Sequence, residues 1–84
     1  MSDVDVFETL VQVIREETGN SDIEIDEDTT AADVPGWDSL AHVRIVMNVE
    51  VSLGVPIVIE DTYVAANVGE LVRILRKSVQ ASGA

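Results

Sequence analysis

The 84-residue sequence contains no cysteine, only three aromatic residues and only five basic residues. Without cysteine, the chain has no disulfide, no thiolate nucleophile and no cysteine-based zinc site, which favours a cytoplasmic protein. The five basic residues stand against 16 acidic ones, giving a net charge of −11. Because nucleic acids and anionic membranes are bound by basic patches, this balance argues against both as partners.

Long apolar runs are also missing. No stretch approaches the roughly 20 apolar residues of a membrane-spanning helix, and the N-terminus has neither the basic nor the apolar region of a signal peptide. Apolar residues nevertheless make up 46% of the chain, enough for one small core. We therefore expect a single, monomeric domain over residues 1–84, with an ordered core over about residues 3–79.

A first helix is predicted over residues 3–18, with Asp3 suited to its N-cap and Gly19 to its C-terminal stop. Its apolar residues follow the i, i+3, i+4, i+7 spacing of one helix face, namely Phe7, Leu10, Val11 and Ile14. Residues 19–38 are predicted to form one long acidic loop that Ile23, Ile25 and Val34 anchor to the core. A loop of this length in a small domain is typically functional or disordered, and the anchoring residues favour function.

A second helix is predicted from Ser39 to Leu53, with Asp38 as its N-cap. At 100° per residue, its apolar side chains fall on two stripes. The first stripe comprises Ile45, Val46, Val49 and Leu53, and the second comprises Leu40, Val43, Met47 and Val51. Either neighbouring helices bury both stripes, or the second stripe is exposed and forms a docking surface beside Ser39.

The remaining chain is predicted to form a buried extended segment over residues 56–59, a short helix or turn over about 60–66, and a last helix. Asn67 and Glu70 suit a capping box at the start of that helix. Residues 81–84 are expected to fray. The inner face of the last helix comprises Val68, Leu71, Val72, Leu75 and Val79, and its solvent face carries Arg73, Arg76 and Lys77.

Enzyme chemistry is poorly supported. His42 is the only histidine and follows Ser39 by three residues, but the chain has no GxSxG motif and no group to orient the imidazole. We therefore expect no enzyme and interpret His42 as a helix-surface residue. Trp37 is either packed against the bundle or a contact residue beside Ser39. The acidic run from Asp22 lacks the required glycine and glutamate of a calcium loop, so no intrinsic metal site is expected.

These features together resemble the acyl carrier proteins, the phosphopantetheine-binding carrier family, in its discrete stand-alone form. The resemblance covers about residues 4–77. The residues that carry it are Asp28-Thr29 and Asp33, then Asp38-Ser39-Leu40, then Val43, Ile45-Val46-Met47 and Glu50, and finally Asn67-Val68-Gly69-Glu70-Leu71.

The resemblance implies an all-α four-helix bundle with a long loop between helices 1 and 2 and a short third helix. It implies that Ser39 carries a 4′-phosphopantetheine arm, delivered from coenzyme A by a phosphopantetheinyl transferase, and that Asp38 assists this metal-dependent loading. Acyl intermediates of fatty-acid, polyketide or other specialised biosynthesis would travel on the arm as thioesters. Activating ligases and synthase or transferase enzymes would dock on the second helix through Leu40, Val43, Arg44, Met47 and Glu50.

The sequence departs from fatty-acid carriers in three places. Arg44 and Val51 stand where acids are common, and Ala65 stands where a bulkier aliphatic side chain is usual. Pro35-Gly36-Trp37 leads into the serine, and the resulting Gly36–Leu40 motif resembles discrete carriers of specialised pathways. Two alternatives remain open. One is an aminoacyl, peptidyl or D-alanyl carrier with the same arm, and the other is a small acidic protein-interaction module without a prosthetic group.

Overall fold

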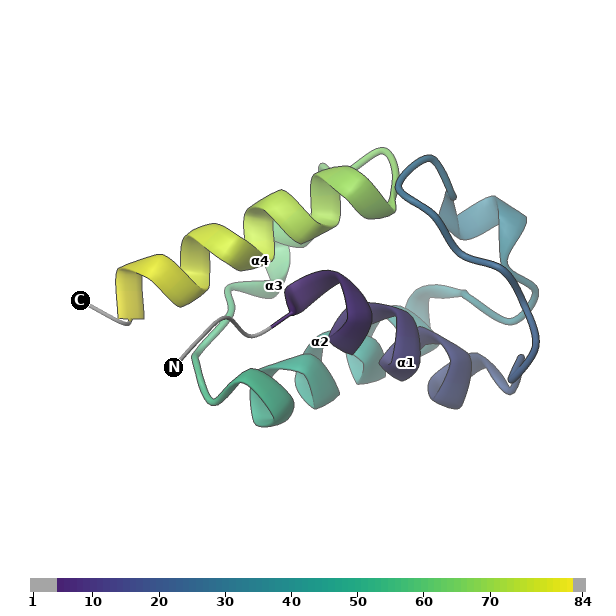
Figure 1. Cartoon of the computed structure of the whole chain (residues 1–84), viewed down its shortest axis with the longest axis horizontal. Coiled ribbons are helices and arrows are strands. Elements are labelled where there is room, and N and C mark those ends of the chain that lie inside the picture. Colours follow the sequence, from purple (N-terminus) through teal and green to yellow (C-terminus); the bar gives the residue numbers. More distant parts are fainter. Residues whose placement is uncertain (1–4, 83–84) are drawn as a thin grey trace.

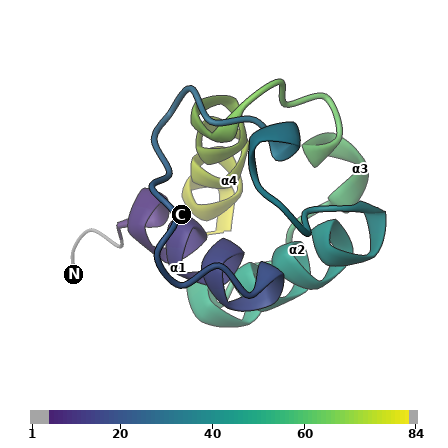
Figure 2. The same ribbon diagram turned by 90° about the vertical axis from the view of Figure 1, so that its right-hand side faces the viewer.

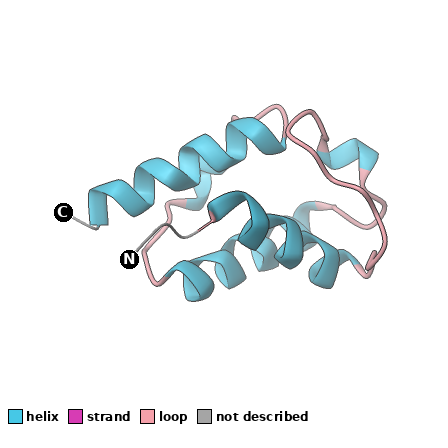
Figure 3. Ribbon diagram, viewed as in Figure 1, coloured by secondary structure: helices cyan, strands magenta, loops and turns pink. Residues whose placement is uncertain are grey.

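The computed structural model describes residues 5–82, which fold into four α-helices without any strand (Figures 1 and 3). A single 3-10 turn, η1, interrupts the long loop between the first two helices at Ala31–Asp33. The predicted all-α bundle with a short third helix is therefore confirmed. The helices are α1 (Val6–Thr18), α2 (Ser39–Leu53), α3 (Ile59–Thr62) and α4 (Val68–Ser82).

Helix α1 begins later than predicted. Asp5 is its N-cap, and the Asp5 carboxylate accepts a hydrogen bond from the Glu8 N–H at 3.1 Å. The predicted cap, Asp3, lies outside the described residues. At the other end, Gly19 adopts φ 74° and donates its N–H to the Arg15 carbonyl, as the sequence predicts for a helix stop.

The bounds of α2 agree with the prediction at both ends. The Asp38 carboxylate accepts a hydrogen bond from the Ala41 N–H at 2.8 Å, and Gly54 closes the helix.

Helix α4 is capped by Asn67, whose side chain accepts the Glu70 N–H. The Glu70 carboxylate accepts the Ala66 N–H rather than that of Asn67, so the predicted capping box is displaced by one residue. The helix extends through Ala81 and Ser82, into the segment that was predicted to fray.

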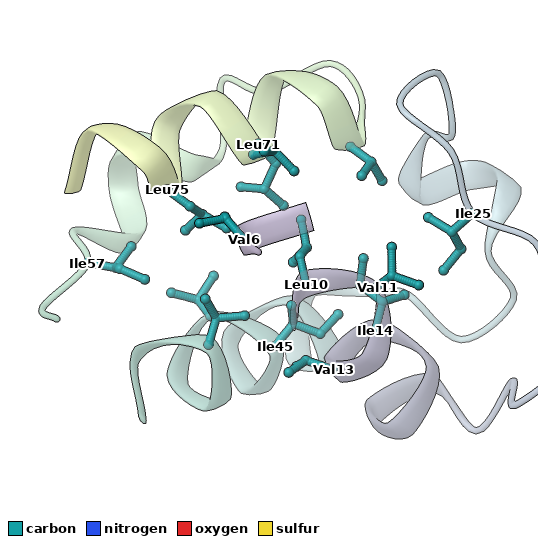
Figure 4. Close-up of a cluster of buried hydrophobic side chains, with 14 of the residues drawn as sticks. Val6, Leu10, Val11, Val13, Ile14, Ile25, Ile45, Ile57, Leu71 and Leu75 are labelled. Carbon is teal, nitrogen blue, oxygen red and sulfur yellow. The ribbon is translucent and has the colours of Figure 1, made fainter. Parts of the chain in front are cut away.

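The core lies where α1 packs against both α2 and α4. Figure 4 shows Leu10 of α1 at its centre, between Ile45 of α2 and Leu71 of α4. Viewed from the end, α1, α2 and α4 surround this core, and α3 lies between α2 and α4 (Figure 2). Each fully buried aliphatic side chain contributes about 1.5–3 kcal/mol by leaving water, so these contacts hold the bundle together. Ile25 and Val34 are also buried and anchor the long loop, as predicted.

The two stripes of α2 have different environments. Ile45, Val46 and Val49 of the first stripe are buried in the core. In the second stripe, by contrast, Leu40 is 69% exposed and Val51 is 81% exposed. Of the two alternatives left open by the sequence, exposure of the second stripe is therefore the observed one.

The segment before α3 is only partly buried. Ile57 is buried as predicted, but Val58 is exposed, because the chain turns into α3 at Ile59. Helix α3 is also shorter than the predicted range of about 60–66. It ends at Thr62, whose side chain is only 1% exposed although its neighbours on both sides are solvent-accessible.

Candidate functional site

Ser39 is exposed at the first residue of α2, and the chain leading to it is fixed to the end of α1. The Asn20 side-chain amide donates to the Pro35 carbonyl at 2.6 Å and to the Thr18 hydroxyl at 2.9 Å. Gly36 follows with φ +89°, and a Cβ there would lie 3.2 Å from the Thr18 carbonyl oxygen. Glycine is thus favoured by the left-handed backbone, and a Cβ would in addition press against the Thr18 carbonyl oxygen. The sequence indicated turn formers at these positions but not this tether.

Asp38 shapes the start of α2. Its carboxylate caps the helix by accepting the Ala41 N–H, and its carbonyl accepts the His42 N–H at 2.9 Å. The residue is exposed, so its negative charge lies at the surface next to Ser39. The backbone N–H groups and the positive dipole end of α2 are directed to the same place. This end of the helix is therefore suited to hold an anionic group on Ser39.

A chain of hydrogen bonds that the sequence analysis missed lies beside Ser39. The Trp37 indole Nε1–H donates to His42 Nδ1 at 3.2 Å, and His42 Nε2 is 2.8 Å from Thr62 Oγ1. The Thr62 hydroxyl donates in turn to the Ile59 carbonyl at 2.6 Å. We call this chain the Trp–His–Thr relay. His42, which was expected on the helix surface, is half-buried within it, and Trp37 packs against the core.

Burial lowers the pKa of His42 from its ordinary value of 6.5. The unfolded chain therefore binds a proton below about pH 6.5 that the folded chain does not, and folding stability should fall as the pH drops from 6.5 toward the lowered pKa. Urea unfolding between about pH 7.5 and about pH 5.5 would measure this loss above the range in which most carboxyl groups titrate. His42→Gln cannot titrate and should lack this component. Equal pH slopes in both proteins would contradict the prediction.

The charged residues predicted to meet partners make internal contacts. Arg44 Nε lies 3.2 Å from Glu17 Oε1, and the other oxygen of Glu17 accepts from the Asn48 amide at 2.6 Å. The Glu50 carboxylate accepts the Ile57 N–H at 2.7 Å, which ties α2 to the segment before α3. The apolar residues predicted to meet partners are more accessible. Leu40 and Met47 are exposed, and Val43 is half-buried.

Over residues 5–82, no three histidine or acidic side chains are grouped so that they could hold a metal ion. Within the same range, no helix combines the length and apolar character needed to cross a membrane.

The sequence matches a model of a known protein family. The sequence model described as "Phosphopantetheine attachment site" matches residues 8–75, which is more than half of the chain. The chain therefore belongs to the family of phosphopantetheine-binding carrier proteins, which hold 4′-phosphopantetheine covalently on a serine. Such a carrier interacts with the enzymes that modify it and handle its cargo. Searches of curated proteins and of solved structures gave no match.

Proposed function

We propose that this chain is a monomeric, non-catalytic acyl carrier protein and that Ser39 is the residue that carries the 4′-phosphopantetheine arm. The exposed position of Ser39 at a helix N-terminus carries this assignment. The range matched by the family contains two other serines. Ser21 lies in the long loop, and Ser52 lies in the last turn of α2. Because the negative end of the helix dipole disfavours an anionic phosphodiester, Ser52 is the poorer site.

Asp38 is proposed to assist loading. Its exposed carboxylate stands one residue before Ser39, where it can help hold the metal ion that the transferase uses. When bound, the arm supplies a terminal thiol that carries the acyl group as a thioester. The chain has no cysteine and so no thiol of its own. The absence of cysteine also supports the proposed cytoplasmic location.

Partner enzymes are proposed to dock on the exposed part of α2, through Leu40, Val43 and Met47. Arg44 is paired with Glu17, and the Glu50 carboxylate accepts the Ile57 N–H. Their charges are therefore already engaged within the protein and contribute less to binding a partner. Docking should then depend on apolar burial more than on ion pairs. The Gly36–Leu40 motif and Arg44 support a specialised acyl pathway rather than bulk fatty-acid synthesis.

The proposal is tested by incubating the full chain with coenzyme A, magnesium and a broad-specificity phosphopantetheinyl transferase. We expect the intact mass to increase by one phosphopantetheine group, and peptide mapping to place the group on Ser39. An unchanged mass, or a group on Ser21 or Ser52, would contradict it. Offering the loaded protein to acyl-activating and aminoacyl-activating ligases then distinguishes an acyl carrier from an aminoacyl carrier.

A further inference from the structure

The Trp–His–Thr relay connects three segments that meet beside Ser39. Trp37 belongs to the loop before α2, His42 lies one helical turn after Ser39, and Thr62 ends α3. The ring of Tyr63 stacks on His42 with centroids 4.9 Å apart. These four side chains also line a cavity of about 190 Å³ at this end of the bundle. The relay thus lines this cavity and connects the N-terminal end of α2, where Ser39 lies, with α3.

The donors and acceptors in the relay determine which ring nitrogen of His42 carries the proton. An indole N–H can only donate, so His42 Nδ1 must accept, and the proton of the neutral imidazole is on Nε2. That N–H donates to Thr62 Oγ1, and the Thr62 hydroxyl hydrogen goes to the Ile59 carbonyl. The opposite tautomer would place two N–H donors against each other at Trp37. Only the Nε2–H form therefore satisfies all members of the relay.

Helix α3 needs such a tie. It has four residues, and its N-cap Val58 makes no side-chain cap hydrogen bond. A helix of this length is not stable by itself, so tertiary contacts must fix its position. Thr62 is its buried residue, and the hydroxyl of Thr62 is the atom that joins α3 to His42. Removing that hydroxyl should loosen α3 and, through His42, also Trp37.

We propose that Trp37, His42 and Thr62 are positioning residues that hold α3 and the loop before α2 against the first turn of α2, so that the surface around Ser39 is preformed for the transferase. The inference rests on the proposed function, because it takes Ser39 as the loading site. None of the three residues needs to contact the reacting atoms. Their effect is to keep most molecules in the arrangement that binds the enzyme.

The chain has one tryptophan and one histidine, so NMR can observe the relay without ambiguity. In the unmodified full chain, ¹⁵N-detected imidazole spectra should show the Nε2–H tautomer. Thr62→Val removes the hydroxyl and keeps the side-chain shape, and it should shift both the indole N–H and the α3 amide signals. Thr62→Ser keeps the hydroxyl and should leave the indole signal near its wild-type position. An Nδ1–H tautomer, or an indole signal unmoved by Thr62→Val, would overturn the inference.

The kinetics of arm loading test whether the relay helps the transferase to bind. With a broad-specificity transferase, Thr62→Val should raise the KM for the carrier by about 3- to 10-fold with little change in kcat, because a smaller fraction of molecules is binding-competent. Thr62→Ser should restore the wild-type KM. Trp37→Phe keeps an aromatic ring and removes the indole N–H, so it should raise the KM as Thr62→Val does. It replaces Thr62→Val in this test if that variant does not fold.

The outcomes separate the two proposals. If wild-type protein is not loaded at all, the proposed function fails, while the NMR result still decides whether the relay exists. If wild-type protein is loaded and both Thr62→Val and Trp37→Phe have its KM, the positioning role is wrong.

Discussion

Ser39→Ala should abolish loading of the arm while leaving the fold intact. In the proposed reaction the Ser39 hydroxyl oxygen attacks the phosphate of coenzyme A that carries the arm, and alanine has no hydroxyl to do so. Ser39 is exposed, and the cap between Asp38 and Ala41 does not use its side chain. Alanine is also the best helix former, so stability should change by no more than about 0.5 kcal/mol. Intact mass spectrometry after transferase treatment measures the loss, and circular dichroism confirms the fold.

Ser52→Ala is the matched control. Ser52 lies in the same helix and is also exposed, but at the end where the dipole is negative. This variant should load like the wild-type chain. A mass increase that persists in Ser39→Ala would mean that the arm is attached to another residue. If neither the wild-type chain nor the Ser52 variant gains mass, the protein-interaction module without a prosthetic group becomes the better description.

Local signals explain why the second helix was predicted correctly. Asp38 and Gly54 lie next to the ends that they form, so the sequence contains both boundaries of α2 within a few residues. The start of α1 was harder: the sequence prediction placed the N-cap at Asp3, but the cap is Asp5. Which of them begins the helix depends on packing of the first turn, where Val6 is buried. That contact cannot be read from the local pattern.

The contacts around Ser39 were missed for a related reason. His42 and Thr62 are 20 residues apart, and Arg44 and Glu17 are 27 apart. Each pair forms only once helices are placed side by side. The exposed stripe of α2 was at least recognisable as an alternative, because its apolar side chains fall on two stripes and a small bundle can leave one of them uncovered. A single buried threonine in α3 has no periodicity that could have indicated its partner.

Ile45→Ala should lower the free energy of unfolding by about 2–5 kcal/mol. The Ile45 side chain is completely buried in the first stripe of α2, and truncation leaves a cavity in the core. Alanine gains only a few tenths of a kcal/mol in helix propensity, which is too little to compensate. A domain of this size has a total stability of about 4–13 kcal/mol. The loss is therefore a large share of the whole, and urea unfolding followed by circular dichroism would measure it.

Val51→Ala in the same helix gives the comparison that tests the two-stripe assignment. Val51 is 81% exposed, so its truncation removes few contacts, and the better helix propensity of alanine offsets them. Its unfolding free energy should stay within about 0.5 kcal/mol of wild type. Equal losses at Ile45 and Val51 would mean that the second stripe is also buried in solution, by another copy of the chain. The face beside Ser39 would then be closed to partner enzymes, and the proposed docking surface would be wrong.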